Sequence, residues 1–388
     1  MENRCIDTSV APHRHGLTSD RRPPSAAGRL ALRLLCGAIC VALPPAAAKA
    51  DELPRDFAAF QTGISPGIAP RLDATPRHYR QIEPAIHQLC LDHADQLDSL
   101  PDDQRLATIL ELAKFIDRKR DDAGDVVVIG PDRAVIGLLD PDRGLEPKEI
   151  TAIAAAYGAR ATVLKQDPAR ETIPEVAARF LAAVEAAATS GAPTTVVVLG
   201  HGLPGEIQSY AIPFARLADA LVGPPDGATA PLDLGRMVLV CDDCYSADFL
   251  ENLGNAVEAR CRDRGRAVRS LPVMIAGTNH HRVGHADFGE KFVPHFWKDV
   301  IELFFVRRPH PPAVTLRDFF ENVDNMMYGY GRAPIVEGGA VVGYRLVDPE
   351  LCQDPVSFVP LSAEDQAALR TILGLAPDAP LPAFLDVG

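Results

Sequence analysis

Short apolar runs alternate with longer amphipathic stretches through the middle of the chain, and this alternation constrains the fold more than any other feature. The runs are rich in β-branched and aliphatic residues and span 125–130, 161–165, 194–199, 237–240 and 271–276. Runs this short and uniformly apolar are typical of strands buried on both faces of a parallel sheet. Between and after them, apolar residues recur at helical spacing over 147–158, 173–189, 213–221, 247–260 and 287–305. The connections are long enough for crossover helices, so the sequence predicts an α/β fold with a doubly wound, mainly parallel sheet.

The chain has 388 residues, which is enough for a large α/β domain with additions on both sides. We expect a signal peptide over 1–50, a helical N-terminal region over 51–123, the α/β domain over 124–310 and a C-terminal extension over 311–388. The N-terminal region should hold two helices separated at Pro101. The extension has a hairpin signal around Gly338 and Gly339 and otherwise the pattern of an irregular, proline-rich tail.

The first 50 residues have the pattern of an export signal. Basic residues precede an apolar run over 34–43, and small residues follow it up to Ala50. The run is too short to span a bilayer, which favours cleavage after Ala50 over an anchored helix. We therefore expect a secreted or periplasmic protein without a stable membrane anchor.

Acidic residues outnumber basic ones, and the formal net charge is −13. Such a charge disfavours nucleic acid and anionic membranes as partners, because both repel an acidic surface. The sequence leaves the oligomeric state open.

Two chemically active residues come shortly after predicted strands. His201 lies between Gly200 and Gly202 after the run 194–199, and Cys244 follows the run 237–240. The carboxyl ends of parallel strands meet at one edge of a sheet, where ligands bind, so we expect both side chains at that edge. The start of the next helix stabilises a thiolate through its N–H groups and dipole.

This arrangement suits nucleophilic catalysis without a cofactor. Cys244 would attack a carbonyl carbon, and His201 would protonate the leaving amine. The backbone N–H groups of Gly202 and Cys244 would stabilise the oxyanion, since glycine lets the backbone approach it closely.

The strings Leu199-Gly-His-Gly202 and Asp242-Asp-Cys-Tyr-Ser-Ala247 resemble the caspase, legumain (haemoglobinase) and gingipain clan of cysteine peptidases. In that clan a strand ends in His-Gly and the next one ends in the catalytic cysteine. The resemblance covers about 125–305 and implies a caspase-like domain that hydrolyses peptide bonds of a peptide or protein substrate through a thioester acyl-enzyme. Asp243 stands where the clan has a small residue, and Ala247 stands where it has a glycine.

The loop after the run 271–276 lies at the same predicted edge. The resemblance implies that it borders the pocket for the residue before the scissile bond, with Thr278, Asn279 and His280 as candidate substrate-binding residues. Three histidines fall within 277–285, but their spacing matches no metal site, so we expect no metal.

Two other functions stay open. Cys241 and Cys244 form a Cys-x-x-Cys motif between a strand and a helix, as in thiol-disulfide oxidoreductases. A non-catalytic caspase-like binding module is the other, motivated by Asp243 and Ala247.

The remaining candidates receive structural roles. Cys241 is expected to pack in the core, and Trp297 is expected to pack within a helix. Asp242 and Asp243 are expected to cap the helix that follows them, which is the commoner role, or to repel anions from the site. Three further cysteines are disulfide candidates, namely Cys90, Cys261 and Cys352.

Overall fold

The computed structural model describes residues 68–72, 76–141, 147–224, 230–278, 297, 300, 304, 311–323, 332–337, 340–346 and 356–387. They all belong to one compact unit that begins at Phe60. The expected signal peptide and most of the helix expected over 287–305 lie outside these residues. Among the described helices, none combines the length and hydropathy needed to cross a membrane.

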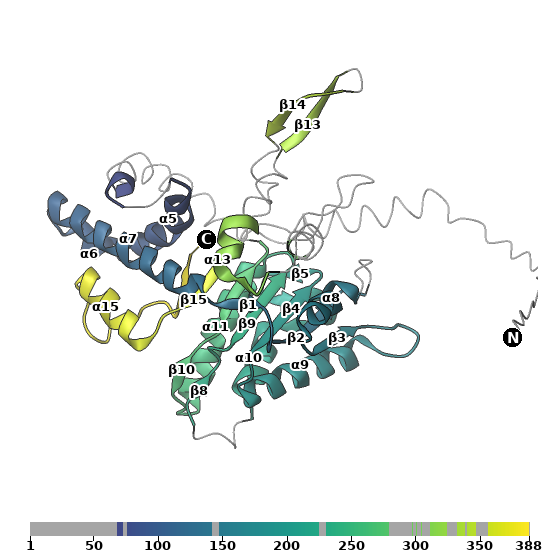
Figure 1. The fold of residues 1–388 in the computed structure, drawn as a ribbon. Helices are drawn as coiled ribbons and strands as arrows, with labels where there is room; N and C mark the ends of the chain where they lie inside the picture. The colour runs from purple at the N-terminus through teal and green to yellow at the C-terminus, as the bar shows by residue number, and fades with distance from the viewer. Residues whose placement is uncertain are drawn as a thin grey trace, which may run out of the picture. The chain divides into compact units, whose positions relative to one another are not determined.

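A seven-stranded sheet forms the centre of the described fold, in the order β16-β15-β11-β9-β4-β2-β3 (Figure 1). Five neighbouring strands are parallel: β2 (Ala134–Leu139), β3 (Ala161–Lys165), β4 (Thr194–Leu199), β9 (Met237–Asp242) and β11 (Val273–Ala276). β15 (Val356–Pro360) and β16 (Phe384–Asp386) continue the sheet antiparallel at one edge. The predicted α/β class with a mainly parallel sheet is confirmed.

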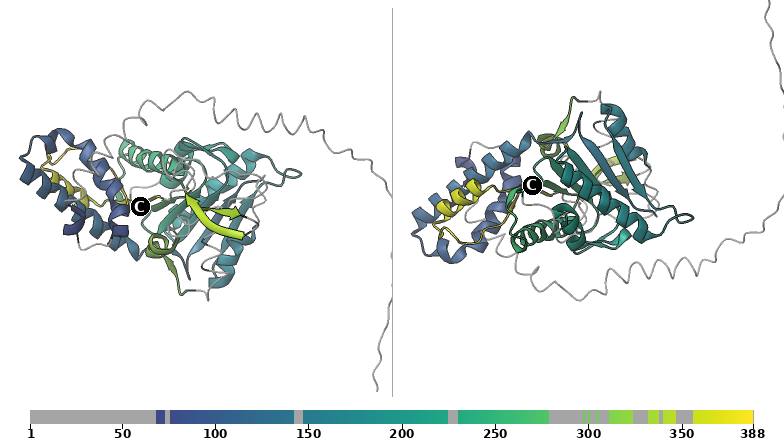
Figure 2. Two further views of the ribbon diagram at one scale, coloured as in Figure 1. Left: turned by 90° about the horizontal axis from the view of Figure 1, so that it is seen from above. Right: turned by 90° about the horizontal axis from the view of Figure 1, so that it is seen from below.

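Helices cover both faces of the sheet (Figure 2). The core behind α9 (Ile173–Ser190), α10 (Phe214–Val222) and α11 (Ser246–Asp263) takes Leu239 and Cys241 from β9. The opposite core, which includes α8 (Lys148–Tyr157), takes Val238 and Val240 from the same strand. The alternation follows from strand geometry, in which successive side chains point to opposite faces.

One strand assignment from the sequence is wrong. The run 125–130 forms only the short strand β1 (Val127–Ile129), which pairs antiparallel with β12 (Val314–Thr315) outside the central sheet. The first parallel strand is instead β2, which pairs with both β3 and β4 along its length. A turn with Asp132 at φ 62° separates the two runs. Both runs are apolar, and the longer one satisfies more backbone hydrogen bonds between its two neighbours in the sheet.

The N-terminal region is helical, as expected. A 3-10 turn, η1 (Ala69–Arg71), precedes α5 (Pro76–Asp92), α6 (Ala94–Asp98) and α7 (Asp102–Gly124). The break predicted at Pro101 is confirmed, because α7 begins directly after it, but the single helix expected before it is divided into α5 and α6.

The expectation of an irregular C-terminal tail is wrong for residues 356–387. Two of its segments are strands of the central sheet, and α15 (Ala363–Leu373) packs against α7 with a 3.0 Å ion pair between Lys119 and Asp365. These elements are short and flanked by prolines, so their periodicity is too brief to distinguish them from an irregular tail. The hairpin expected around Gly338 and Gly339 is confirmed as β13 (Arg332–Glu337) paired with β14 (Ala340–Leu346).

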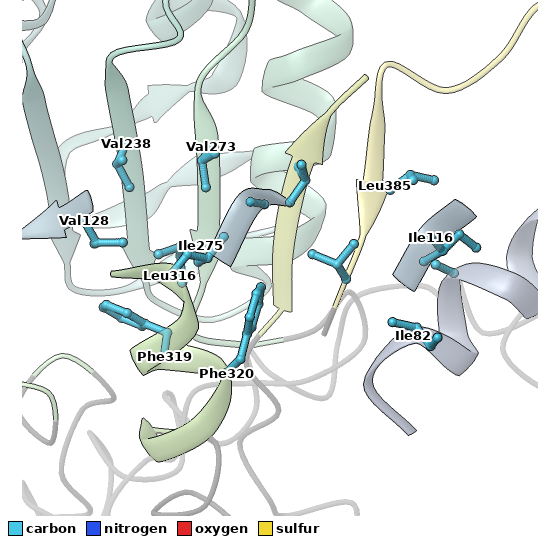
Figure 3. Packing of buried hydrophobic residues seen from close by; sticks show 14 of the residues in the cluster. Ile82, Ile116, Val128, Val238, Val273, Ile275, Leu316, Phe319, Phe320 and Leu385 are labelled. Carbon is cyan, nitrogen blue, oxygen red and sulfur yellow. The ribbon is translucent and has the colours of Figure 1, made fainter. Parts of the chain in front are cut away.

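The N-terminal helices, the sheet and the short α13 (Leu316–Asp318) with η4 (Phe319–Val323) share one hydrophobic cluster. Figure 3 shows part of it: Ile82, Ile116, Val238, Val273, Ile275, Leu316, Phe319, Phe320 and Leu385. Trp297 is fully buried in this cluster, which agrees with its expected packing role. The N-terminal region and the sheet therefore bury one continuous core.

Candidate functional site

His201 and Cys244 follow neighbouring strands that end at the same level. The last register pair of β4 and β9 joins Leu199 to Asp242, and the Gly200 N–H donates to the Asp242 carbonyl at 3.4 Å. The prediction that both residues lie at one sheet edge is confirmed. His201 is exposed and Cys244 is half-buried.

The turn that carries His201 packs directly on the turn that carries Cys244. A Cβ atom built on Gly202 would overlap the Cys244 carbonyl oxygen and lie 2.7 Å from Asp243 Cγ. Real Cβ atoms do not approach other atoms so closely, so only glycine fits here. Gly202 thus allows the backbone of the histidine turn to approach the backbone of the cysteine turn closely.

A sharp turn presents Cys244 between β9 and α11. Tyr245 adopts the left-handed conformation (φ 58°, ψ 29°), which is uncommon for a residue with a side chain, and α11 begins at the next residue. Cys244 therefore lies at the start of an 18-residue helix whose positive end faces it.

Thr278, two residues after β11, holds this turn in place through hydrogen bonds. It is fully buried, and its hydroxyl donates to the Asp243 carbonyl at 3.0 Å while accepting the Ser246 N–H at 3.1 Å. Its carbonyl accepts the Ala247 N–H at 3.1 Å. Thr278 thus bonds to the residues on both sides of Cys244. Asn279 and His280 lie outside the described residues. Substrate binding by these three residues stays a prediction.

Two functional candidates were missed by sequence reasoning. Asp140 directly follows β2, is buried, and accepts a hydrogen bond from Ser209 Oγ. Ser209 Oγ in turn accepts the backbone N–H of His201 at 3.0 Å. The sequence signal for Asp140 is a carboxylate directly after the apolar run 134–139, which forms β2.

The expected capping role of Asp242 and Asp243 is wrong. The N-cap of α11 is Tyr245, and the first helical N–H groups donate to Thr278 instead. Both carboxylates are buried. Asp242 accepts a hydrogen bond from the backbone N–H of Trp297 at 2.9 Å, and Asp243 accepts one from the Cys241 thiol at 3.4 Å. Both residues lie before the turn rather than at the helix start, so their carboxylates accept hydrogen bonds at the edge of the sheet instead of from the helix.

Cys241 is a core residue, as expected. It is fully buried, and burial together with the neighbouring Asp243 carboxylate raises the pKa of its thiol well above the usual value. Burial also raises the pKa of Cys90 to about 12. Cys90 and Cys261, two of the disulfide candidates, carry free thiols. They pack in different hydrophobic clusters, so they do not form a disulfide with each other. Cys352 lies outside the described residues.

These thiols differ in the reactivity that we expect of them. Iodoacetamide at pH 8 should label Cys244 before Cys90, Cys241 and Cys261, because only thiolates react and burial keeps these other three protonated or shielded. Peptide mapping by mass spectrometry measures each site separately. Labelling in guanidinium chloride is the control, in which all four should react. Early labelling of Cys241 in the folded protein would contradict this site.

Within the described ranges, no group of three or more His, Cys, Asp or Glu side chains could hold a metal ion. The histidines of the segment 277–285 lie outside those ranges. No protein-family model matches the chain, and no curated protein matches it either.

Proposed function

We propose that this chain is a cysteine-type endopeptidase with a caspase-like domain, in which Cys244 is the nucleophile and His201 its partner. The contact of Gly202 with the backbone of Cys244 and the carboxyl group of Asp243 carries this proposal. It joins the two turns that must act on one peptide bond. Successive parallel strands that end in His-Gly and in the cysteine turn also agree with the resemblance to that clan.

The proposed reaction proceeds through a thioester. The Cys244 thiol gives its proton to His201, and its sulfur attacks the peptide carbonyl carbon. The C–N bond then breaks, and His201 passes that proton to the leaving amine. A water molecule then loses a proton to His201 and displaces the sulfur, which releases the carboxylate product. The N–H groups of Gly202 and Cys244 would stabilise the oxyanion in both steps.

The described contacts disfavour the oxidoreductase alternative. Exchange at a Cys-x-x-Cys motif needs a resolving thiol that ionises and reaches the other sulfur. Cys241 is buried in the core, donates to Asp243 and has a raised pKa. Its thiol therefore suits packing rather than exchange.

Cleavage of a diverse peptide library under reducing conditions tests the proposal. Cys244→Ala and His201→Ala should each lower kcat/KM by about 10³-fold or more, because the reaction loses its nucleophile or its proton donor. Cys90→Ala is the matched control, since it removes a thiol from an N-terminal helix, and it should cleave like the unmutated chain.

Two outcomes would contradict the proposed function. Cleavage that survives in Cys244→Ala would assign the activity to another group. Peptide binding without cleavage, both before and after limited proteolysis of the chain, would overturn the peptidase and support the binding module.

A further inference from the structure

We infer that Ser209, held by the buried carboxylate of Asp140, is the residue that positions His201, through its backbone. This inference rests on the proposed function, because it assigns the support of the histidine in that reaction. Neither residue belongs to the two motifs that carry the resemblance.

Ser209 holds the backbone of His201 at both of its polar groups. Its hydroxyl oxygen accepts the His201 N–H at 3.0 Å, and its own N–H donates to the His201 carbonyl at 3.3 Å. The hydroxyl also fills the space beside Gly200, where a Cβ atom would lie 2.9 Å from Ser209 Oγ. The peptide units around His201 are thereby fixed in one orientation.

Asp140 determines how the Ser209 hydroxyl is used. A hydroxyl has one proton, and it donates that proton to Asp140 Oδ2. Its lone pairs then face the His201 N–H. Asp140 itself is 1% exposed and is fixed to the sheet, because its N–H donates to the Leu199 carbonyl at 2.8 Å. A hydrogen bond to a carboxylate is stronger than one between two neutral groups.

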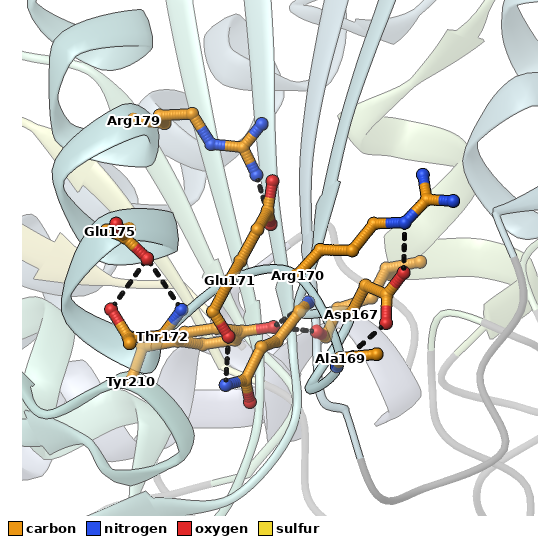
Figure 4. A network of polar contacts seen from close by, with 10 residues as sticks. Asp167, Ala169, Arg170, Glu171, Thr172, Glu175, Arg179 and Tyr210 are labelled. Atoms are coloured by element: carbon orange, nitrogen blue, oxygen red, sulfur yellow. Dashed lines mark hydrogen bonds and ion pairs between the residues drawn. The ribbon is translucent and has the colours of Figure 1, made fainter.

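The next residue anchors this support to the ends of β2 and β3. Tyr210 belongs with Ser209 to the 3-10 turn η2 (Gln208–Tyr210), and its hydroxyl donates to the Leu139 carbonyl at 2.6 Å while accepting the Gln166 N–H at 3.1 Å. Figure 4 shows Tyr210 beside the loop from Asp167 to Thr172, which is braced by its own hydrogen bonds and ion pairs. The turn η2 therefore bridges the ends of β2 and β3 and holds the segment after β4.

The segments on both sides of η2 form a small antiparallel sheet, with β5 (Gly202–Leu203) and β6 (Glu206–Ile207) before the turn and β7 (Ile212–Pro213) after it. This sheet begins at Gly202, the residue that touches the cysteine turn. Movement of Ser209 would therefore change the approach of His201 to Cys244 without changing the sheet edge itself.

Ser209→Ala should lower kcat by about 10- to 100-fold and leave KM within about twofold, because misplacement of a catalytic group slows chemistry more than binding. Asp140→Asn keeps the shape of the side chain and should lower kcat less. The double variant should lose no more than Ser209→Ala alone, since the two residues act through one hydrogen bond.

The chain contains a matched control outside the central sheet, in a separate two-stranded sheet. Ser270, at the end of β10 (Val268–Ser270), donates to Asp233 of β8 (Leu232–Asp233) and accepts the Gly235 N–H at 2.8 Å, which is the same pattern. Ser270→Ala removes equivalent bonds and should leave kcat unchanged.

A second readout does not depend on cleavage. Hydrogen exchange followed by mass spectrometry should show faster exchange of peptides that cover 199–203 in Ser209→Ala and in Asp140→Asn, but not in Ser270→Ala. Unchanged exchange there, or a kcat equal to that of the unmutated chain, would overturn the positioning role. An unmutated chain that cleaves no peptide would instead overturn the proposed function, while the exchange result would still decide the hydrogen-bond chain.

Discussion

Replacing Gly202 with alanine is expected to lower the free energy of unfolding by about 1–3 kcal/mol, as overpacking of a well-packed site does. It should also lower kcat/KM by about 10²-fold or more, because the histidine turn must move away from the cysteine turn. The added Cβ meets the Cys244 carbonyl oxygen and the Asp243 carboxyl group, and the carbonyl belongs to backbone that cannot rotate aside. Chemical denaturation and peptide cleavage measure the two effects.

Gly191→Ala separates the loss of stability from the loss of geometry. Gly191 ends α9 at φ 62°, and a Cβ atom built there meets no atom within 4 Å. Alanine should cost about 1 kcal/mol there from its left-handed conformation, while cleavage stays unchanged. Full activity of Gly202→Ala would show that the two turns need not touch for catalysis.

Thr278→Val is expected to lower the free energy of unfolding by about 2–4 kcal/mol. The hydroxyl bonds to the Asp243 carbonyl and the Ser246 N–H, and both groups are buried, so its removal leaves two polar groups unsatisfied at about 1–3 kcal/mol each. Cleavage should fall as well, because these bonds hold the turn on both sides of Cys244. Thermal unfolding and kcat/KM are the measurements.

The conservative variant tests the cause. Thr278→Ser keeps the hydroxyl and loses one buried methyl group, so it should cost about 1 kcal/mol and retain cleavage. Equal losses in both variants would show that the methyl group, rather than the hydrogen bonds, is what the site needs.

These variants test one structural arrangement. Four neighbouring parallel strands, β2, β4, β9 and β11, are followed by Asp140, His201, Cys244 and Thr278 respectively. The sheet therefore brings together residues that are up to 138 positions apart in the chain. Binding at the carboxyl ends of strands is the general rule for open α/β sheets.

Local pattern was sufficient for much of this fold. The strands β3 and β4 and the start of α9 agree with the predicted bounds to the residue. Each depends on side chains a few positions apart, whose period reports helix or strand directly. The placement of His201 and Cys244 at one edge followed from the same local signals and from the parallel arrangement of their strands.

The tertiary structure alone decided which apolar run enters the sheet and what the polar residues at its edge contact. The runs that became β1 and β2 are both apolar, and only pairing with distant strands distinguishes them. Asp242 and Asp243 precede a helix, yet their oxygens bond to Trp297 and Cys241 rather than to that helix. Periodicity records which face a residue takes, whereas a hydrogen bond depends on what lies across from it, and distant parts of the chain supply that partner.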